Sequence, residues 1–289
     1  MNRLSTGIER LDEALGGGLL PGSMTMFIGA TGVGKTQFGM HFAEAGQRQE
    51  GHLAAIIDLS SRGDSQNHSG YTERMFGSEL TVADIASEKL RCPFTDGKPE
   101  ALLPFLGYGG RRVLRSQMDV DEWHAWQSEL NRRMPQLSRY VYAHLIAGTR
   151  RFVVDGIEPQ EAANDSLQLD LLELVYHRML RKEYDWLARE VLRENFRQNQ
   201  THVDANAYEH QDSAAIVLVT TKQTMLDQLM MEPLSDGDIA AGANTVILLG
   251  RQLEDGAMKR GIYIAKHRGS YAEQRILNFD INDSGIVFE

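Results

Sequence analysis

The stretch from Gly29 to Thr36, GATGVGKT, constrains the fold of this chain more than any other part of the sequence. It satisfies the pattern G-x-x-x-x-G-K-[ST], in which glycines let the backbone curl so that successive N–H groups point inward at an anion. The apolar run MTMFIG precedes the loop, and the helical pattern GKTQFGMHFAEAGQRQ continues from it. The sequence therefore predicts a strand, a phosphate-binding loop and a helix whose positive end faces the anion.

The residue types of this loop also predict its ligand. Lys35 is expected to reach the β- and γ-phosphates of a nucleoside triphosphate, and the Thr36 hydroxyl is expected to ligate Mg²⁺. The expected binding set is the loop together with the residue that follows it: Gly29, Ala30, Thr31, Gly32, Val33, Gly34, Lys35, Thr36 and Gln37.

A second carboxylate is needed to hold the water shell of the metal, and the apolar segment RRFVVDG supplies one in Asp155. The carboxyl ends of parallel strands meet at one edge of a sheet, so a strand ending in Asp155 would place it beside the loop. We therefore expect Thr36 and Asp155 to form the metal side of the site.

The other apolar runs predict the remaining architecture. Strands are expected near residues 52–60, 214–221, 245–250, 260–267 and 275–281, and helices near 7–15, 119–134 and 166–196. Ser5 or Thr6 is expected to cap the first of these helices, Pro135 to break or kink the second, and the third to break near Lys182. This order predicts an α/β fold with a central, mostly parallel sheet flanked by helices and an antiparallel C-terminal extension.

Composition narrows the classes of protein. The formal net charge of −10 disfavours a protein that coats DNA, because neutralising phosphates requires a basic surface. A single cysteine, Cys92, excludes an internal disulfide and fits a reducing compartment. The N-terminus lacks a signal-peptide pattern, and no apolar run approaches the ~20 residues that span a bilayer. We therefore expect a cytoplasmic protein that does not engage a membrane.

The segment LSTGIERLDEALGGGLLPGSMTMFIGATGVGKT resembles the N-terminal signature of the KaiC-like ATPases in the RecA/RadA superfamily. Near the other end, TVILLGRQLEDGAMKRGIYIAKHRGS resembles their two strands, hairpin and K-x-R-G-S/T tip. The resemblance covers residues 4–46, 151–156 and 214–288. It implies a RecA-type P-loop NTPase fold, ATP and Mg²⁺ as cofactors, ATP hydrolysis, and a homo-oligomer that is commonly a hexameric ring with nucleotide between subunits.

The resemblance also implies a role for the tip. In KaiC-like rings the matching segment reaches the γ-phosphate of the neighbouring subunit, as an arginine finger does. Lys266 and Arg268 alternate along the chain, so in an extended segment they share one side and His267 takes the other. Gly269 is expected to allow the tight reversal that follows. We expect Lys266 and Arg268 to contact ATP across a subunit interface.

One departure from the family concerns catalysis. In these ATPases the strand after the P-loop helix ends in one or two glutamates, one of which polarises the attacking water, whereas this chain has Leu59, Ser60 and Ser61 there. A hydroxyl is a very weak base near pH 7, so a general-base contribution of ~10²–10⁴-fold would be missing. Ser60 and the nearest carboxylate, Asp58, are the candidate catalytic residues of this strand. The carboxylates that could substitute from a loop are Asp64, Glu73 and Glu158.

A second departure is length. The segments at about 62–148 and 164–211 are long for the fold and do not resemble the family. The sequence contains no internal repeat and no low-complexity linker. We therefore expect one domain over residues 1–289 with two insertions, which carry what is specific to this protein.

Two segments near the end of the strand at 214–221 bear on function. Thr220 and Thr221 occupy the position where RecA-type proteins sense the γ-phosphate, although a capped strand end explains them equally well. We include Thr221 in the expected nucleotide site. The loop that follows, TMLDQLMMEPLSDGDIAAG, contains four acidic residues and no Lys or Arg, so it would repel a phosphate backbone.

The leading interpretation is an ATP-binding, ring-forming ATPase with slow or atypical hydrolysis that acts as a nucleotide-dependent switch or scaffold for protein partners. One alternative is a RecA/RadA-type DNA recombination or repair ATPase, which salt-sensitive, ATP-dependent binding of single-stranded DNA would favour. The other is a pseudo-ATPase with structural ATP, which tight ATP binding, little turnover and ATP-dependent assembly would favour.

Overall fold

The computed structural model describes residues 2–60, 67–85, 94, 97–106, 118–158, 167–231 and 239–289. The strands of this part form one sheet in the order β3-β2-β4-β5-β1-β6-β7-β8-β9. In chain order the strands are β1 (Met24–Ala30), β2 (Ala55–Asp58), β3 (Leu102–Pro104), β4 (Arg151–Ile157), β5 (Ala214–Thr221), β6 (Thr245–Glu254), β7 (Ala257–His267), β8 (Leu277–Asn282) and β9 (Gly285–Phe288).

The pairing directions divide the sheet into two parts. Strands β3, β2, β4, β5, β1 and β6 pair in parallel, whereas β7, β8 and β9 extend the sheet by antiparallel pairing. This confirms the predicted fold class. Strands β3 and β9 were not expected, because segments of three and four residues carry too little periodicity to be recognised.

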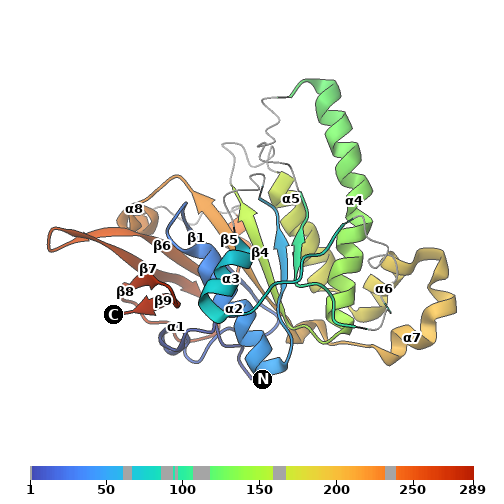
Figure 1. The fold of residues 1–289 in the computed structure, drawn as a ribbon, viewed down its shortest axis with the longest axis horizontal. Coiled ribbons are helices and arrows are strands. Elements are labelled where there is room, and N and C mark those ends of the chain that lie inside the picture. The colour runs from blue at the N-terminus through green and yellow to red at the C-terminus, as the bar shows by residue number, and fades with distance from the viewer. Residues whose placement is uncertain are drawn as a thin grey trace.

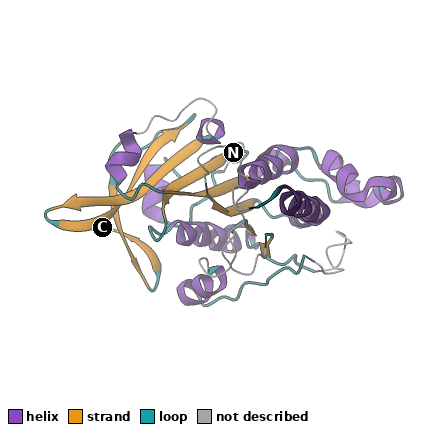
Figure 2. Ribbon diagram, turned by 90° about the horizontal axis from the view of Figure 1, so that it is seen from above, coloured by secondary structure: helices purple, strands orange, loops and turns teal. Residues whose placement is uncertain are grey.

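Helices cover both faces of the sheet (Figures 1 and 2). One core contains buried side chains of α1, α2 and the β8–β9 hairpin, with partly buried side chains of α3 packed against it, and the other contains buried side chains of α4 to α8. Successive residues of the central strands alternate between these cores, as Met26 and Phe27 do in β1. The α-helices are α1 (Glu9–Ala14), α2 (Lys35–Glu50), α3 (His68–Phe76), α4 (Val120–Ile146), α5 (Leu167–Glu173), α6 (Tyr184–Leu192), α7 (Gln200–Ala205), α8 (Leu226–Met231) and α9 (Ile239–Gly242).

The start of α1 differs from the expectation. The prediction that Ser5 or Thr6 caps this helix is wrong, because Ile8 occupies the N-cap position without a side-chain cap. Instead, the carboxylate of Asp12 accepts hydrogen bonds from the backbone N–H and the hydroxyl of Thr6, each at 2.7 Å. The polar residues before the helix therefore stabilise the preceding turn.

Of the two expected helix breaks, the one at Pro135 is absent and the one near Lys182 is present. Pro135 does not break α4, which continues to Ile146 because its second half buries Leu137 and Val141 in the core and thereby offsets the lost backbone hydrogen bond. The helix near Lys182 does break: α5 passes into a π-helical segment, η4 (Leu174–Leu180), and α6 starts at Tyr184. Short 3₁₀ turns follow at η5 (Arg193–Asn195), η6 (Arg197–Asn199) and η7 (His210–Asp212).

The expected insertions contribute α3, β3 and α4, and then α5 to α7. Strand β3 joins the common sheet, and α4 extends beyond the rest of the fold at its N-terminal end (Figure 1). The limits of a single domain stay a prediction. Within the described residues, every helix is too short or too polar to cross a membrane.

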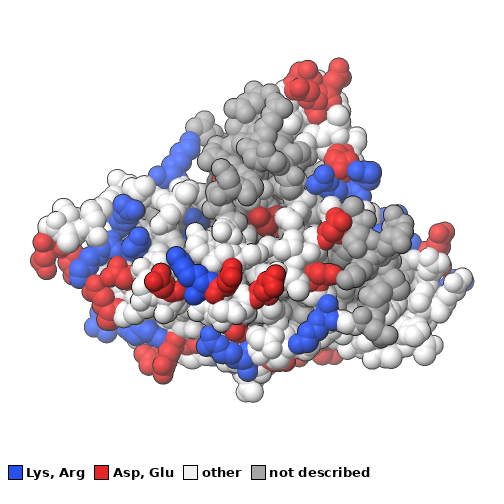
Figure 3. Space-filling view, in the orientation of Figure 1, with Lys and Arg blue, Asp and Glu red and all other residues white. Residues whose placement is uncertain are grey.

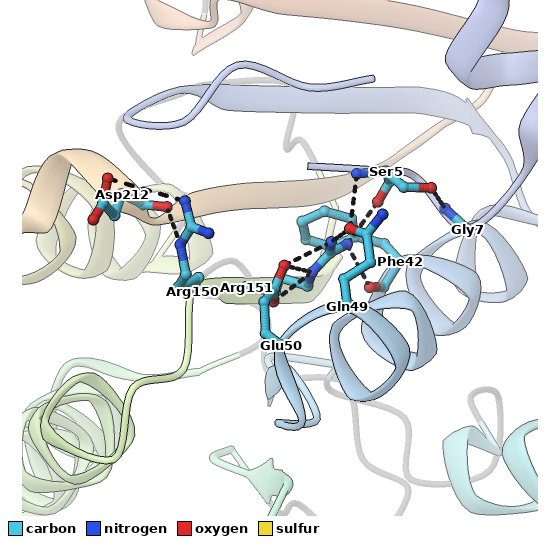
Figure 4. Close-up of polar contacts among 8 residues, drawn as sticks. All are labelled: Ser5, Gly7, Phe42, Gln49, Glu50, Arg150, Arg151 and Asp212. Atoms are coloured by element: carbon cyan, nitrogen blue, oxygen red, sulfur yellow. Dashed lines mark hydrogen bonds and ion pairs between the residues drawn. The ribbon is translucent and has the colours of Figure 1, made fainter. Parts of the chain in front are cut away.

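A buried arginine joins the P-loop helix to the central sheet. Arg151, the first residue of β4, is fully buried and forms an ion pair with Glu50 at the end of α2, at 2.9 Å (Figure 4). Its guanidinium also donates to the backbone carbonyls of Ser5 and Phe42, and it lies 4.7 Å from the centre of the Phe42 ring. The C-terminal end of α2 and the N-terminal end of β4 are therefore fixed to each other.

Candidate functional site

The glycine-rich loop connects the end of β1 to the start of α2. Gly34 is the N-cap residue of α2 and has a φ of 112°, a conformation that residues with a side chain rarely adopt. A Cβ there would also lie 2.9 Å from Cδ1 of Ile281, in the C-terminal hairpin. Val33 is buried and anchors the loop, whereas Thr31 and Gly32 are exposed. The loop therefore presents its tip to solvent at the N-terminal end of a 16-residue helix.

The lysine of the loop is held inside it. Lys35 is buried, and its Nζ donates to the backbone carbonyls of Gly29 and Ala30, each at 2.9 Å. Burial lowers the pKa of Lys35 to about 8, and the negative charges of Asp155 and Glu158 oppose that shift. An anionic phosphate would add a further favourable charge and strengthen the protonated form.

The structure brings the two expected metal-side residues together. The Thr36 hydroxyl donates to Oδ2 of Asp155 at 2.9 Å, and the carboxylate of Asp155 is almost fully buried. The backbone N–H of Gly156 donates to the other oxygen, Oδ1, at 2.7 Å. A hydroxyl and a carboxylate are the hard oxygen donors that suit Mg²⁺, which usually takes its other ligands from water and substrate phosphates. The residues present therefore fit a nucleotide-bound Mg²⁺.

His68 is a member of this site that the sequence did not reveal. It is the first residue of α3, and its Nε2 lies 3.1 Å from Oδ2 of Asp155, with both side chains 1% exposed. Burial lowers the pKa of His68, but the hydrogen bond to Asp155 and the charges of Asp155 and Asp58 outweigh burial, so the pKa is raised. The sequence does signal the start of α3, because the side chain of Asn67 accepts from the N–H of Gly70 as a helix cap. It does not signal the contact of His68, whose partner lies 87 residues away.

The strand expected to carry the catalytic glutamates ends in a different group. Asp58 is the last residue of β2 and pairs in register with Asp155 of β4, so both carboxylates lie at the same edge of the sheet. Oδ1 of Asp58 accepts from the backbone N–H of Ser60 at 2.7 Å. Burial raises the pKa of Asp58, and the charge of His68 and the hydrogen bonds from Ser60 partly oppose it. Leu59 is fully buried, so among the described residues of this strand end Asp58 and Ser60 have the polar side chains; Ser61 lies outside the described residues.

The substitute carboxylates lie in different places. Glu73 is on α3, and Glu158 follows β4 and raises the pKa of Lys35 by its charge, against the larger effect of burial. Asp64 lies outside the described residues.

Thr221 ends the strand next to the loop. It pairs in register with Ala30, and Thr220 pairs with Gly29, so the end of β5 lies beside the start of the loop. The hydroxyl of Thr221 donates to the side-chain oxygen of Gln223.

The basic tip, which contains Lys266 and Arg268, and the glycine-rich loop lie at opposite ends of the sheet strands. His267 of β7 pairs with Thr245, and Thr245 pairs with Thr25, near the start of β1. The Nζ of Lys266 donates to the carbonyl of Ala240 at 3.2 Å, and Arg268 is exposed. The structure therefore does not bring these two cations to the P-loop of their own chain.

The N-terminal segment supports the tip. Gly269 has a φ of 74°, as expected for the reversal after β7. Arg3 donates to the hydroxyl of Ser270, and Arg10 forms an ion pair with Glu273 at 2.7 Å. The two segments that carry the family resemblance therefore contact each other.

Comparisons with known proteins agree with this fold. A family model described as the KaiC ATPase matches residues 4–81. The circadian clock oscillator protein KaiC of Rippkaea orientalis (strain PCC 8801 / RF-1) is 24% identical over 284 residues, which are 98% of this chain and 41% of that protein. The chain thus spans less than half the length of this curated relative.

A solved structure supports the same fold. The KaiC-like protein of the hyperthermophilic archaeon Pyrococcus horikoshii OT3 superposes with a TM-score of 0.51 at 19% identity, covering 99% of this chain and 98% of that one. At this identity the likeness concerns the fold alone. The expected resemblance is confirmed: this chain is similar over nearly its whole length to KaiC-like ATPases of the RecA/RadA superfamily and has their RecA-type fold.

Proposed function

We propose that this chain binds ATP and Mg²⁺ where β1, β2, β4 and β5 end, and that it works as a nucleotide-dependent switch or scaffold in a homo-oligomeric ring. The observation that carries the proposal is the contact between the Thr36 hydroxyl and the buried carboxylate of Asp155, next to a buried Lys35. Equilibrium binding of ATP with and without Mg²⁺ tests it. Binding that is strengthened by Mg²⁺ is expected, and an absence of binding under both conditions would refute it.

Each residue has a distinct role in this proposal. The loop from Gly29 to Thr36 holds the phosphates through its backbone N–H groups, and Lys35 moves from the loop carbonyls to the phosphates. Thr36 and Asp155 hold the metal and its water, and bound Mg²⁺ supplies charge neutralisation at the phosphates. Thr221 lies beside the loop and contacts the terminal phosphate.

Hydrolysis is proposed to be slow, with Asp58 as the nearest carboxylate to the attacking water. Its side chain is partly buried at the same edge as Asp155, and no glutamate occupies the end of β2. Turnover of Asp58→Asn and Ser60→Ala, measured against the unmodified chain, tests this assignment. A loss of turnover in Asp58→Asn alone supports Asp58 as the base. Fast turnover that neither substitution changes would contradict both the slow rate and the assignment.

The tip is proposed to act on the neighbouring subunit. Lys266 and Arg268 lie at the sheet edge away from their own loop, so a contact between these cations and ATP requires a second copy. Burial lowers the pKa of Lys266, and the nearby charge of Arg268 lowers it further. An anion shared by the two side chains would relieve that repulsion.

Mass measurement in solution with and without ATP·Mg²⁺, paired with a turnover assay, tests the ring. Assembly that depends on ATP is expected. Tight binding and assembly with no turnover would instead support the alternative in which ATP is structural.

DNA binding is the less favoured function. Over the face drawn in Figure 3, basic and acidic side chains of the described residues are interspersed, which differs from the basic stripe of many nucleic-acid-binding surfaces. Filter binding of single-stranded DNA at two salt concentrations, with and without ATP, tests this ranking. Retention of DNA that requires ATP and falls steeply with salt would overturn it.

A further inference from the structure

We infer that His68 is a positioning residue for Asp155, and that through this contact α3 responds to occupation of the metal site. The inference rests on the proposed function, because it assigns a role in binding Mg²⁺ together with ATP. It concerns a residue outside the P-loop pattern, near the end of the segment that the family model matches.

The carboxylate of Asp155 is held by three different elements. Its Oδ2 accepts from the Thr36 hydroxyl of α2 at 2.9 Å and lies 3.1 Å from Nε2 of His68 on α3. Its Oδ1 accepts from the N–H of Gly156 at 2.7 Å. Donors on both oxygens fix the plane of the carboxylate, which bulk water cannot do at a side chain that is 1% exposed.

His68 is itself held in place. Asn67 caps α3, and the carbonyl of His68 accepts from the Thr72 hydroxyl at 2.9 Å. The same hydroxyl lies 3.5 Å from the sulfur of Met40, so α3 rests on the helix that starts at the P-loop. A side chain that is fixed on a supported helix orients its partner more tightly than one on a loop does.

A space-filling role would not require this geometry. An imidazole that only filled a cavity would need apolar neighbours, whereas His68 directs a ring nitrogen at the oxygen that Thr36 also contacts. Groups of this kind, which orient a metal-holding carboxylate, commonly contribute 10–100-fold to metal affinity. In this chain the group comes from α3, while the end of β2 supplies serines instead of glutamates.

Two substitutions of similar volume separate the two roles. His68→Gln keeps an N–H donor near the position of Nε2, and His68→Met fills the space without a donor. The measurement is the Mg²⁺ concentration that half-saturates binding of a non-hydrolysable ATP analogue, checked with Mn²⁺ by electron paramagnetic resonance. We expect His68→Met to require roughly 10–100 times more Mg²⁺ and His68→Gln to stay near the unmodified chain.

His144→Met provides the matched control. His144 is also buried, and its ring nitrogens lie 3.1 Å from the Thr149 hydroxyl and 3.0 Å from the carbonyl of Glu100, away from the P-loop. Its loss should lower thermal stability without changing the Mg²⁺ requirement. Hydrogen exchange over residues 68–76 tests the response of α3: added Mg²⁺ and analogue should slow exchange in the unmodified chain and in His68→Gln, but not in His68→Met.

The outcomes distinguish this inference from the proposed function. If the unmodified chain does not bind the analogue, the proposed function fails. If it binds and His68→Met needs the same Mg²⁺ concentration or less, His68 does not position the metal-side carboxylate. If the Mg²⁺ requirement rises but exchange in α3 is unchanged by the ligand, the response of α3 is refuted and the positioning role stands.

Discussion

Thr36 and His68 contact the same oxygen of Asp155, the first at 2.9 Å and the second at 3.1 Å. One residue belongs to the helix that starts at the P-loop and the other to a helix of the first insertion. The metal side of the site thus depends on a helix outside the P-loop as well as on the helix that starts at it.

Replacing the loop lysine should weaken ATP binding. A hydrogen bond to a charged group contributes about 1.5–3 kcal/mol, so Lys35→Ala should raise the Kd for ATP·Mg²⁺ by roughly 10- to 150-fold. Isothermal titration calorimetry measures this change. Lys98→Ala is the control, because Lys98 donates to the carbonyl of Gly51 on the surface. Equal effects of the two substitutions would contradict the role of Lys35.

ATP affinity should fall at alkaline pH. Burial lowers the pKa of Lys35 to about 8 in the free chain, and phosphate binds the protonated amine. Affinity should therefore be nearly constant below about pH 7.5 and decline by up to about tenfold per pH unit above 8, until the pKa of the bound state is reached. Binding measured from pH 6.5 to 9.5 checks this. Lys35→Met should bind weakly and lack the decline, so a decline of the same size in that variant would exclude Lys35 as its source.

Two inactive variants should complement each other. Lys35→Ala has a weakened ATP site but keeps the tip, whereas a variant with both Lys266→Ala and Arg268→Ala lacks the cations of the tip but keeps the loop; both are tested at an ATP concentration that saturates only the second. If the tip contacts ATP of a neighbour, each variant alone stays monomeric with ATP·Mg²⁺, and a mixture forms pairs through one intact interface. Sedimentation velocity detects these pairs. A mixture as monomeric as its components would show that the tip does not act between subunits.

Removing the buried arginine should destabilise the fold. Arg151→Met leaves Glu50 without its buried partner, which typically costs about 3–5 kcal/mol of unfolding free energy. Arg150→Met is the neighbouring control in Figure 4, because Arg150 is partly exposed and contacts Asp212; its loss should cost at most about 1 kcal/mol. Urea unfolding followed by circular dichroism compares them. Similar losses of unfolding free energy in both variants would mean that the burial of Arg151 adds nothing to the stability of the fold.

The sequence predicted the features that depend on local pattern. The glycines and Lys35 identify the P-loop, and the apolar strand before Asp155 places that carboxylate beside it. Both features could be predicted because each depends on a short run of consecutive residues. The contact between His68 and Asp155 could not be predicted, since it joins residues 87 positions apart and depends on how α3 lies against α2. Likewise, the position of the tip at the far edge of the sheet follows from the antiparallel pairing of β6 and β7, which no single segment encodes.

Long-range packing also explains the continuation of α4 through Pro135. A proline predicts a helix break when local hydrogen bonding determines where the helix ends. Here burial of the second half of α4 in the core determines that the helix continues.

The ion pair between Arg151 and Glu50 has a mechanical consequence. Arg151 joins the start of β4 to the end of α2, while Thr36 joins the start of α2 to Asp155 near the end of β4. The helix and the strand are thus fastened at both ends and form a closed frame. For α2 to slide along β4, both the ion pair and the hydrogen bond would have to break, which favours movement of the helix and the strand as one unit. A structural change caused by the nucleotide would therefore be transmitted by elements other than α2 and β4. Among them, α3 contacts Asp155 directly through His68.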